Sequence, residues 1–221
     1  RTLNHAFSLA HGLNMGGLTH LLLGDMEACL AVADELYPLA ERNQFPWPLT
    51  YAKFMRAWLL AQKGDRDTGV ALMLAAADSG PAIVLQSLLL TIAAQMQMLG
   101  GRADDALAVI ERATQKMELQ KNHFYEAETA RLRGEILLRQ SRDNAAQAEA
   151  VFRHAMAVAN KQSCRALELR AATSLARLLT DTGRATEARA LLAPVYGAFT
   201  EGLARPDLQT AKALLAELAR P

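Results

Sequence analysis

Residues 174–192 read SLARLLTDTGRATEARALL, and the pattern in this stretch decides the fold. Two amphipathic segments flank Thr182-Gly183-Arg184, in which a glycine is followed by a polar residue. Because glycine adopts the left-handed conformation without strain, such a pair can end one helix and let the chain reverse. Small residues lie seven positions before the glycine, at Ala176, and five after it, at Ala188. The stretch therefore predicts two helices that pack closely as a hairpin.

A similar turn between two amphipathic segments recurs four more times, at spacings of 37 to 42 residues. In each unit a small residue follows the turn and a larger apolar residue comes four positions later, as with Gly69 and Met73. In the fourth unit this register implies about two extra residues in the turn, over residues 141–144. Small residues let helices approach, and larger ones fill the space between hairpins. The other four turns are Leu23-Gly24-Asp25, Lys63-Gly64-Asp65, Gly100-Gly101-Arg102 and Gln140-Ser141-Arg142.

The composition favours an all-α protein. Alanine and leucine supply 43 and 37 of the 221 residues, whereas valine and isoleucine supply 7 and 4. Strands draw on β-branched and aromatic side chains, and only 5% of these residues are aromatic. Together with the repeats, this predicts an all-α, tetratricopeptide-like solenoid of helical hairpins with about five long repeats and a C-terminal capping helix.

We expect one superhelical domain over residues 1–221, cut from a larger protein. Pro206 and Asp207 mark the start of the capping helix, and Pro81 opens the third unit. Residues 45–48, Phe-Pro-Trp-Pro, are expected to form a loop, and Pro38 and Pro194 to kink or break their helices. The expected units are residues 3–43, 49–78, 81–119, 123–160 and 164–200, followed by the capping helix at 207–220.

Two parts of the sequence carry a family resemblance. They are residues 124–155, with Phe124-Tyr125-Glu126-Ala127-Glu128 and the segment at 131–138, and residues 174–208, with Phe199-Thr200-Glu201-Gly202. From Phe124 to Leu218 the chain resembles the C-terminal tetratricopeptide region of large bacterial signalling ATPases, and more loosely before that. It departs at Ala198, where many relatives carry an aromatic residue.

In that family a class III adenylate or guanylate cyclase domain, or a DNA-binding domain, precedes a nucleotide-binding module and then the repeats. None of the matched residues is catalytic in the family. The resemblance therefore implies the architecture and the setting of the chain and leaves the ligand open.

Charge and hydropathy argue against several classes of partner. With 24 Lys and Arg against 23 Asp and Glu, the net charge is +1, too small to attract nucleic acid or an anionic membrane. No apolar run reaches the roughly 18 residues of a membrane span, and no signal peptide begins the chain. We expect a cytoplasmic location, with Cys29 and Cys164 as buried, reduced thiols.

The sequence offers no recognisable catalytic centre. The glycines at positions 12, 16 and 17 precede no lysine, so they form no phosphate-binding loop and instead indicate close helix contact. The five histidines show no metal-ligand spacing, and no Cys-x-x-Cys occurs. A chain without strands has no nucleophile elbow. We expect no enzyme activity, no metal and no cofactor.

A solenoid of helical hairpins offers a concave wall formed by the first helix of each unit, where peptides or helices can bind. Two interpretations stay open for its side chains. Tyr51, Phe54 and Trp58 form either a binding patch or part of the core, and the arginines either a salt-linked solvated face or a fork for an anion. Projected from the repeats, the wall comprises His11, Asn14, Tyr51, Phe54, Trp58, Thr91, Gln95, Glu128, Arg131, Glu135, Arg170, Thr173 and Arg177.

The leading hypothesis is a non-catalytic interaction and sensing module. The wall would bind a protein segment or an effector and, as the resemblance implies, regulate linked nucleotide-binding and output domains. One alternative is a scaffold that self-associates through its ends or its convex side. Another is a small-molecule site inside the superhelix.

Overall fold

The structure is a computed structural model that describes residues 5–80 and 85–219. Over these residues the chain forms helices joined by short connections, and it contains no strand. The chain divides into two compact units, residues 1–116 and 117–221. The all-α prediction is confirmed for the described part of the chain.

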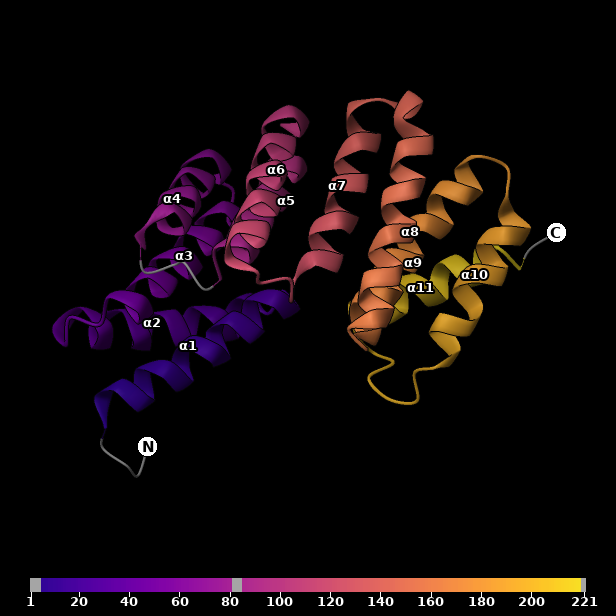
Figure 1. Ribbon diagram of the computed structural model, residues 1–221. Helices are drawn as coiled ribbons and strands as arrows, with labels where there is room; N and C mark the ends of the chain where they lie inside the picture. Colours follow the sequence, from indigo (N-terminus) through magenta and orange to yellow (C-terminus); the bar gives the residue numbers. More distant parts are fainter. Residues whose placement is uncertain (1–4, 81–84, 220–221) are drawn as a thin grey trace. The chain divides into compact units, whose positions relative to one another are not determined.

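In the first unit, consecutive helices pack against one another, and α3 also contacts α1 and α5 (Figure 1). The last helix of this part, α6, ends just past the unit boundary. Pro81, expected to open the third repeat, lies outside the described residues. The helices are α1 (Ala6–Leu23), α2 (Met26–Arg42), α3 (Pro46–Gln62), α4 (Arg66–Asp78), α5 (Gln86–Leu99) and α6 (Ala103–Gln120).

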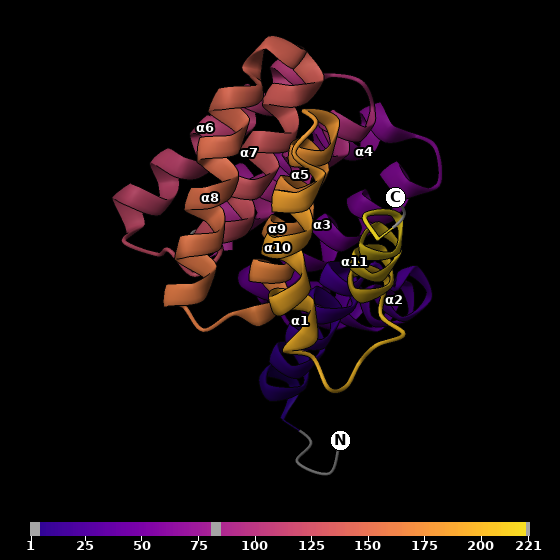
Figure 2. The ribbon, with the colours of Figure 1, turned by 90° about the vertical axis from the view of Figure 1, so that its right-hand side faces the viewer.

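In the second unit, α7 to α10 lie alongside one another in chain order, and α11 packs on α9 and α10 (Figures 1 and 2). A short 3-10 helix, Arg142–Asn144, stands between α7 and α8. It occupies the turn in which about two extra residues were predicted. The helices are α7 (Glu126–Gln140), α8 (Ala145–Lys161), α9 (Arg165–Asp181), α10 (Ala185–Gly197) and α11 (Pro206–Glu217).

All five predicted turns lie between helices. Four of them hold a glycine with positive φ, at Gly24, Gly64, Gly101 and Gly183. A side chain would strain the backbone in that conformation, so glycine is the residue that ends these helices most readily. The fifth turn lacks a glycine and uses the 3-10 helix instead, with the hydroxyl of Ser141 accepting from the amide of Asp143.

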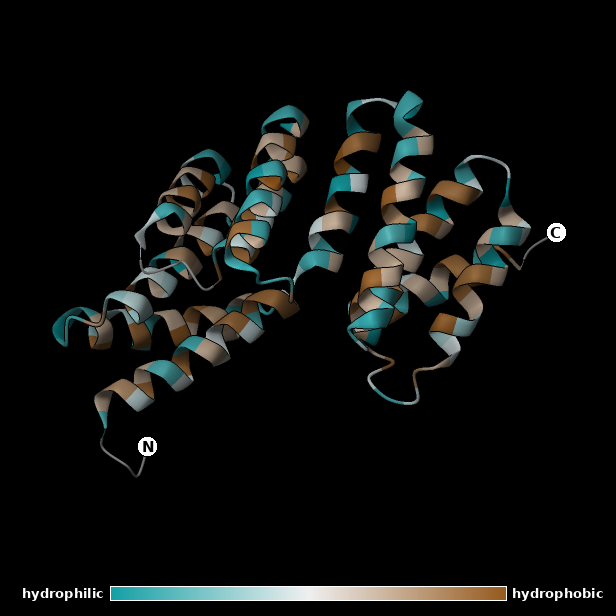
Figure 3. Ribbon diagram, in the orientation of Figure 1, coloured by the Kyte–Doolittle hydropathy of each residue, from teal (hydrophilic) through white to brown (hydrophobic). Residues whose placement is uncertain are grey.

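The predicted packing register is also confirmed. A Cβ added to Gly134 would overlap the ring of Phe152, and one added to Gly17 would overlap the side chain of Met55. Small residues are therefore required where these helices meet. Hydrophobic and hydrophilic residues lie on different faces of the helices (Figure 3). The buried register positions that follow the turns are Cys29, Ala33, Gly69, Met73, Ala106, Ile110, Ala148, Phe152, Ala155, Ala188 and Leu192.

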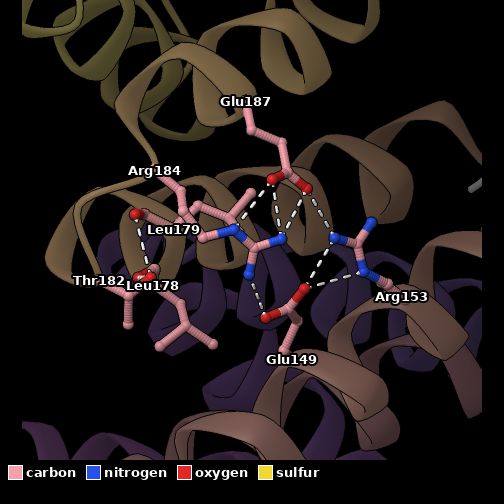
Figure 4. A network of polar contacts seen from close by, with 7 residues as sticks. All are labelled: Glu149, Arg153, Leu178, Leu179, Thr182, Arg184 and Glu187. Atoms are coloured by element: carbon pink, nitrogen blue, oxygen red, sulfur yellow. Dashed lines mark hydrogen bonds and ion pairs between the residues drawn. The ribbon is translucent and has the colours of Figure 1, made fainter.

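Exposed ion pairs join the second helices of neighbouring hairpins. On α8 and α10, Arg184 lies 2.7 Å from Glu149, and Arg153 lies 2.9 Å from Glu187 (Figure 4). In the first unit, Arg112 on α6 similarly lies 2.6 Å from Asp78, the last residue of α4. Water screens these exposed pairs, so they align hairpins that the core holds together.

Some prolines behave differently from the prediction, although Pro206 begins α11 as expected. Residues 46–48 do not form a loop but the first turn of α3, because the first turn of a helix does not use its backbone amides and accepts proline. Neither Pro38 nor Pro194 breaks its helix. Pro194 is close to the end of α10, where losing one hydrogen bond interrupts little of the helix.

The last helix covers the apolar side of the hairpin before it. Leu208, Ala211 and Leu214 are buried in one cluster with residues of α9 and α10, and Leu215 and Leu218 pack against its edge. Gln209, Lys212 and Glu217 are exposed. α11 therefore has one apolar side on the core and one polar side, as predicted for a cap.

Truncation before Pro206 is expected to lower the melting temperature by roughly 5 to 10 °C, because it uncovers the apolar side of α9 and α10. Thermal circular dichroism and light scattering would show the loss of stability and the aggregation of the shortened chain. Lys212→Ala, on the exposed side of α11, should melt like the parent. A truncated chain that stays monomeric with an unchanged melting temperature would rule out the capping role.

None of the helices in residues 5–80 and 85–219 combines the length and hydropathy that a membrane span requires.

Candidate functional site

The aromatic residues predicted on the wall are core residues. The relative exposure of Tyr51 and Phe54 is 1%, and that of Trp58 is 4%. Their helix, α3, contacts α1, α2, α4 and α5, so neighbouring helices cover the face that these three rings share. Burial also raises the pKa of the Tyr51 hydroxyl to about 12. The assignment of these residues to a binding surface is wrong, and the core interpretation is confirmed.

The other wall residues of the first unit do not build a site either. Asn14 is fully buried, and neither atom of its amide has a hydrogen-bond partner in the described protein. Its assignment to an accessible surface is therefore wrong as well, because α1 packs on α2 and α3. His11 is exposed and stacks on Trp47 with ring centroids 5.1 Å apart, and Gln95 is half-buried on α5.

The predicted charged residues of the second unit do come together. They surround a cavity of about 220 Å³, here called the arginine pocket, that opens between α7, α9 and α11. Arg131 is supplied by α7, and Arg170 and Arg177 lie about two turns apart on α9. The residues that line the arginine pocket are Arg131, Arg170, Thr173, Ser174, Arg177, Asp207 and Thr210.

A buried carboxylate holds two of these arginines. Glu128, with 3% relative exposure, accepts hydrogen bonds of 2.9 Å from both Nε and Nη2 of Arg131. Nη2 of Arg170, on the neighbouring helix, lies 2.8 Å from the same carboxylate. Arg131 also donates to Glu135 and to Ser174, at 3.2 Å each. The Arg131 guanidinium thus has hydrogen-bond partners on every side.

The charges of this cluster keep it ionised. Burial alone would raise the pKa of Glu128, but Arg131 and Arg170 outweigh burial and hold that pKa below its ordinary value. Burial would lower the pKa of Arg131, and Glu128 with its hydrogen bonds raises it instead. Burial, followed by the charge of Glu128, raises the pKa of the nearby Tyr125. The tyrosine hydroxyl therefore stays neutral beside a carboxylate that stays charged.

Of the three arginines that line the pocket, Arg177 is the one available to a ligand. This side chain is exposed, and it has no ion-pair partner within the part of the chain that the structure describes. Nε of Arg170 lies 4.0 Å from Asp207, an ion pair at the limit of contact with a half-exposed carboxylate. Guanidinium groups recognise carboxylates with paired hydrogen bonds. Arg177, with Arg170 about two turns before it on α9, is therefore placed to bind an anionic group at the mouth of the pocket.

Sequence reasoning missed several residues of the pocket. Ser174 was not assigned to it, although it follows Arg170 by four positions and therefore lies on the same face of α9. The hydroxyl group of Ser174 donates to Glu135 at 2.6 Å and so links α9 to α7. Asp207 and Thr210 belong to α11, which was predicted only as a cap. No spacing within one helix could have placed them here, because their position depends on how α11 packs on α9.

The described residues give no support for a metal site or for a reactive cysteine. No group of three or more His, Cys, Asp or Glu side chains in residues 5–80 and 85–219 could hold a metal ion. Both cysteines are free: Cys29 is buried as predicted, and Cys164 is half-buried, because it lies at the start of α9. Burial, with a smaller contribution from Asp25, raises the pKa of Cys29 to about 11, so this thiol is protonated and unreactive.

Comparison with known proteins found no match, either among the protein-family models or among the curated proteins.

Proposed function

We propose that the chain is a non-catalytic interaction and sensing module, and that it recognises an anionic group of its partner at the arginine pocket. The observation that carries this proposal is the contrast among the three arginines. Arg131 and Arg170 are held by the buried Glu128, whereas Arg177 faces the same cavity without an ionic partner among the described residues. A preorganised guanidinium that is left unpaired is ready to bind a ligand carboxylate.

The partner we propose is a protein segment that presents an acidic side chain. Successive hairpins with glycine turns and close small-residue contacts support a tetratricopeptide-like module, and such modules bind extended peptides or helices. The arginine pocket measures about 220 Å³, enough for one side chain of a segment lying across its mouth. It would select for the acidic side chain, while the surrounding helices contact the rest of the segment.

The resemblance to the repeat region of signalling ATPases suggests how such binding acts. A partner can shift a regulatory equilibrium only by binding its two states with different affinity. We propose that binding of the partner at the arginine pocket regulates linked nucleotide-binding and output domains. The pocket is made from three helices, α7, α9 and α11, so a change in the packing of α7 on α9 alters the distance between Arg177 and Arg131.

Arg177→Met is expected to weaken the binding of a hexaglutamate peptide by roughly tenfold or more, because it removes a charge-assisted hydrogen bond. Isothermal titration calorimetry at two salt concentrations measures the affinity, and a hexaglutamine peptide tests the need for charge. The matched control is Arg189→Met, since Arg189 is an exposed arginine of α10 outside the pocket. Equal losses of affinity in both variants would show that net charge alone explains the effect, and would refute binding at the arginine pocket.

Self-association remains a second candidate, on a separate observation. Leu22, Leu23 and Met26, at the end of α1 and the start of α2, are each about two-fifths exposed. Apolar side chains grouped on a surface in this way mark contact sites between proteins. Sedimentation analysis of the intact chain and of Leu23→Ser over a range of concentrations would show whether this turn supports a dimer.

A further inference from the structure

A second cavity, unrelated to the arginine pocket, lies in the first unit. It has a volume of about 680 Å³ and is bordered by α3 and α4, with Tyr37 of α2 at its edge. We call it the Lys53 groove. Volumes of this size are typical of sites for small organic ligands. Its lining residues are Tyr37, Thr50, Lys53, Arg56, Ala57, Leu60, Leu72, Ala75, Ala76 and Ser79.

The walls of the Lys53 groove are mainly apolar. Ala57 and Leu60 line it from α3, and Leu72, which is 50% exposed, lines it from α4. The hydroxyls near its polar end are already engaged, since Ser79 donates to the carbonyl of Ala76 at 2.6 Å and lies 3.4 Å from Thr50. An apolar chain would therefore cover surface that is in contact with water and would leave no hydrogen bond broken.

One uncompensated positive charge stands at the rim. Arg56 is neutralised by Asp34 at 3.0 Å and lies over the ring of Tyr37, 4.2 Å from its centre. Lys53, one turn before it on α3, is exposed and has no ion-pair partner within residues 5–80 and 85–219. The groove thus combines an apolar floor with a single free ammonium group.

The preceding hairpin contains another cavity that can be compared with the Lys53 groove. Between α1 and α2 lies a cavity of about 670 Å³, and five of its ten lining residues lie 40 positions before residues that line the Lys53 groove. Its polarity is different: Leu13 stands in place of Lys53, Gly16 in place of Arg56, and Glu35 in place of Ala75. The basic rim therefore belongs to the second hairpin and does not follow from the repeat geometry alone.

We infer that the Lys53 groove binds an amphiphilic carboxylate, that is, a small molecule with one carboxylate and an apolar chain. The carboxylate pairs with Lys53, and the chain lies along α3 toward Leu60, about 10 Å away for seven residues of helix. Each methylene that becomes buried strengthens binding by roughly fourfold. No lysine or arginine is among the described residues that line the first cavity, so that cavity lacks a partner for the carboxylate.

Decanoate is the probe, and isothermal titration calorimetry on the intact chain is the measurement. We expect one site, with hexanoate at least roughly tenfold weaker because fewer methylenes are buried. Lys53→Leu and Ala75→Glu each introduce the residue of the first cavity, and each should weaken decanoate roughly tenfold or more. Both positions are exposed, so neither change disturbs the core. Lys63→Leu, at the exposed turn after α3, is the matched control and should bind like the parent.

Three results would overturn the inference. The first is decanoate affinity that is unchanged in Lys53→Leu and Ala75→Glu. The second is two equivalent sites, which would mean that both cavities bind apolar chains without regard to charge. The third is an acidic amphipathic peptide that competes for Lys53 while decanoate does not bind, which would assign the groove to a protein partner. Arg177→Met should bind decanoate like the parent, so this test stands apart from that of the arginine pocket.

Discussion

Replacing Trp58 with alanine is expected to destabilise the protein by about 3 to 5 kcal/mol, the usual cost of removing a large aromatic side chain from a packed core. Trp58 is 4% exposed and shares its face of α3 with Phe54 and Tyr51, which are each 1% exposed. The loss of the indole leaves a cavity that the surrounding helices cannot close, because their small residues already bring the backbones together. Urea unfolding measured by fluorescence tests this expectation.

The chain contains two tryptophans, both on α3, so Trp47 remains to report on the first unit after Trp58 is replaced. Phe7→Ala is the matched control, because Phe7 is 47% exposed and contacts only one other ring, that of Phe45. It should cost about 1 kcal/mol or less. If Trp58→Ala proved as mild as Phe7→Ala, then α3 would not be packed on the side that carries Trp58, and the interpretation of these rings as a binding patch would have to be restored.

The case of α3 shows what sequence periodicity can and cannot predict. Spacings of three and four place Tyr51, Phe54 and Trp58 on one face, and the structure agrees. Periodicity does not show what covers that face. α3 touches four other helices, so its aromatic face is packed as well as the face that carries Ala57. The aromatic face of α3 is therefore not a binding surface, and the projection of a concave wall failed here.

Turns and close contacts were predictable for a different reason, because they depend on local sterics. The positive φ of Gly64 or Gly183 and the approach of Phe152 to Gly134 each follow from a residue that has no side chain. The proline turn at residues 46–48 was misjudged. The prediction of a loop considered that a proline restricts the residue before it. It did not consider that the first turn of a helix accepts proline.

The arginine pocket was predictable only within single helices. Glu128, Arg131 and Glu135 are three and four residues apart, so their interaction follows from the spacing along α7. The convergence of Arg170 on Glu128 depends on the distance between α7 and α9, which the spacing of residues within either helix does not give. Glu128 was expected on a wall, and its near-complete burial changes its role from ligand contact to anchor for the two arginines.

Arg131→Met is expected to cost about 3 to 5 kcal/mol at neutral pH, since it leaves the buried Glu128 with Arg170 as its remaining cation. Methionine keeps most of the volume of the side chain, so the loss is mainly electrostatic. The double variant Glu128→Met, Arg131→Met should recover a large part of it, because no buried charge is then left without its partner. Arg139→Met, at the exposed end of the same helix, should change the stability by less than about 0.5 kcal/mol.

The pH dependence separates this charge effect from a packing defect. In the parent protein the folded-state pKa of Glu128 lies below its unfolded value, so its stabilisation is present above that value and is lost as the pH falls through the folded pKa. In Arg131→Met, less positive charge opposes the effect of burial, so the pKa of Glu128 rises. Protonation of Glu128 in acid then removes the buried charge that destabilises the folded variant. The difference in unfolding free energy between parent and variant should therefore be largest near pH 7 and should narrow below about pH 4. Urea unfolding followed by circular dichroism at both pH values measures it, and a difference that does not change with pH would mean that Arg131 acts through packing alone.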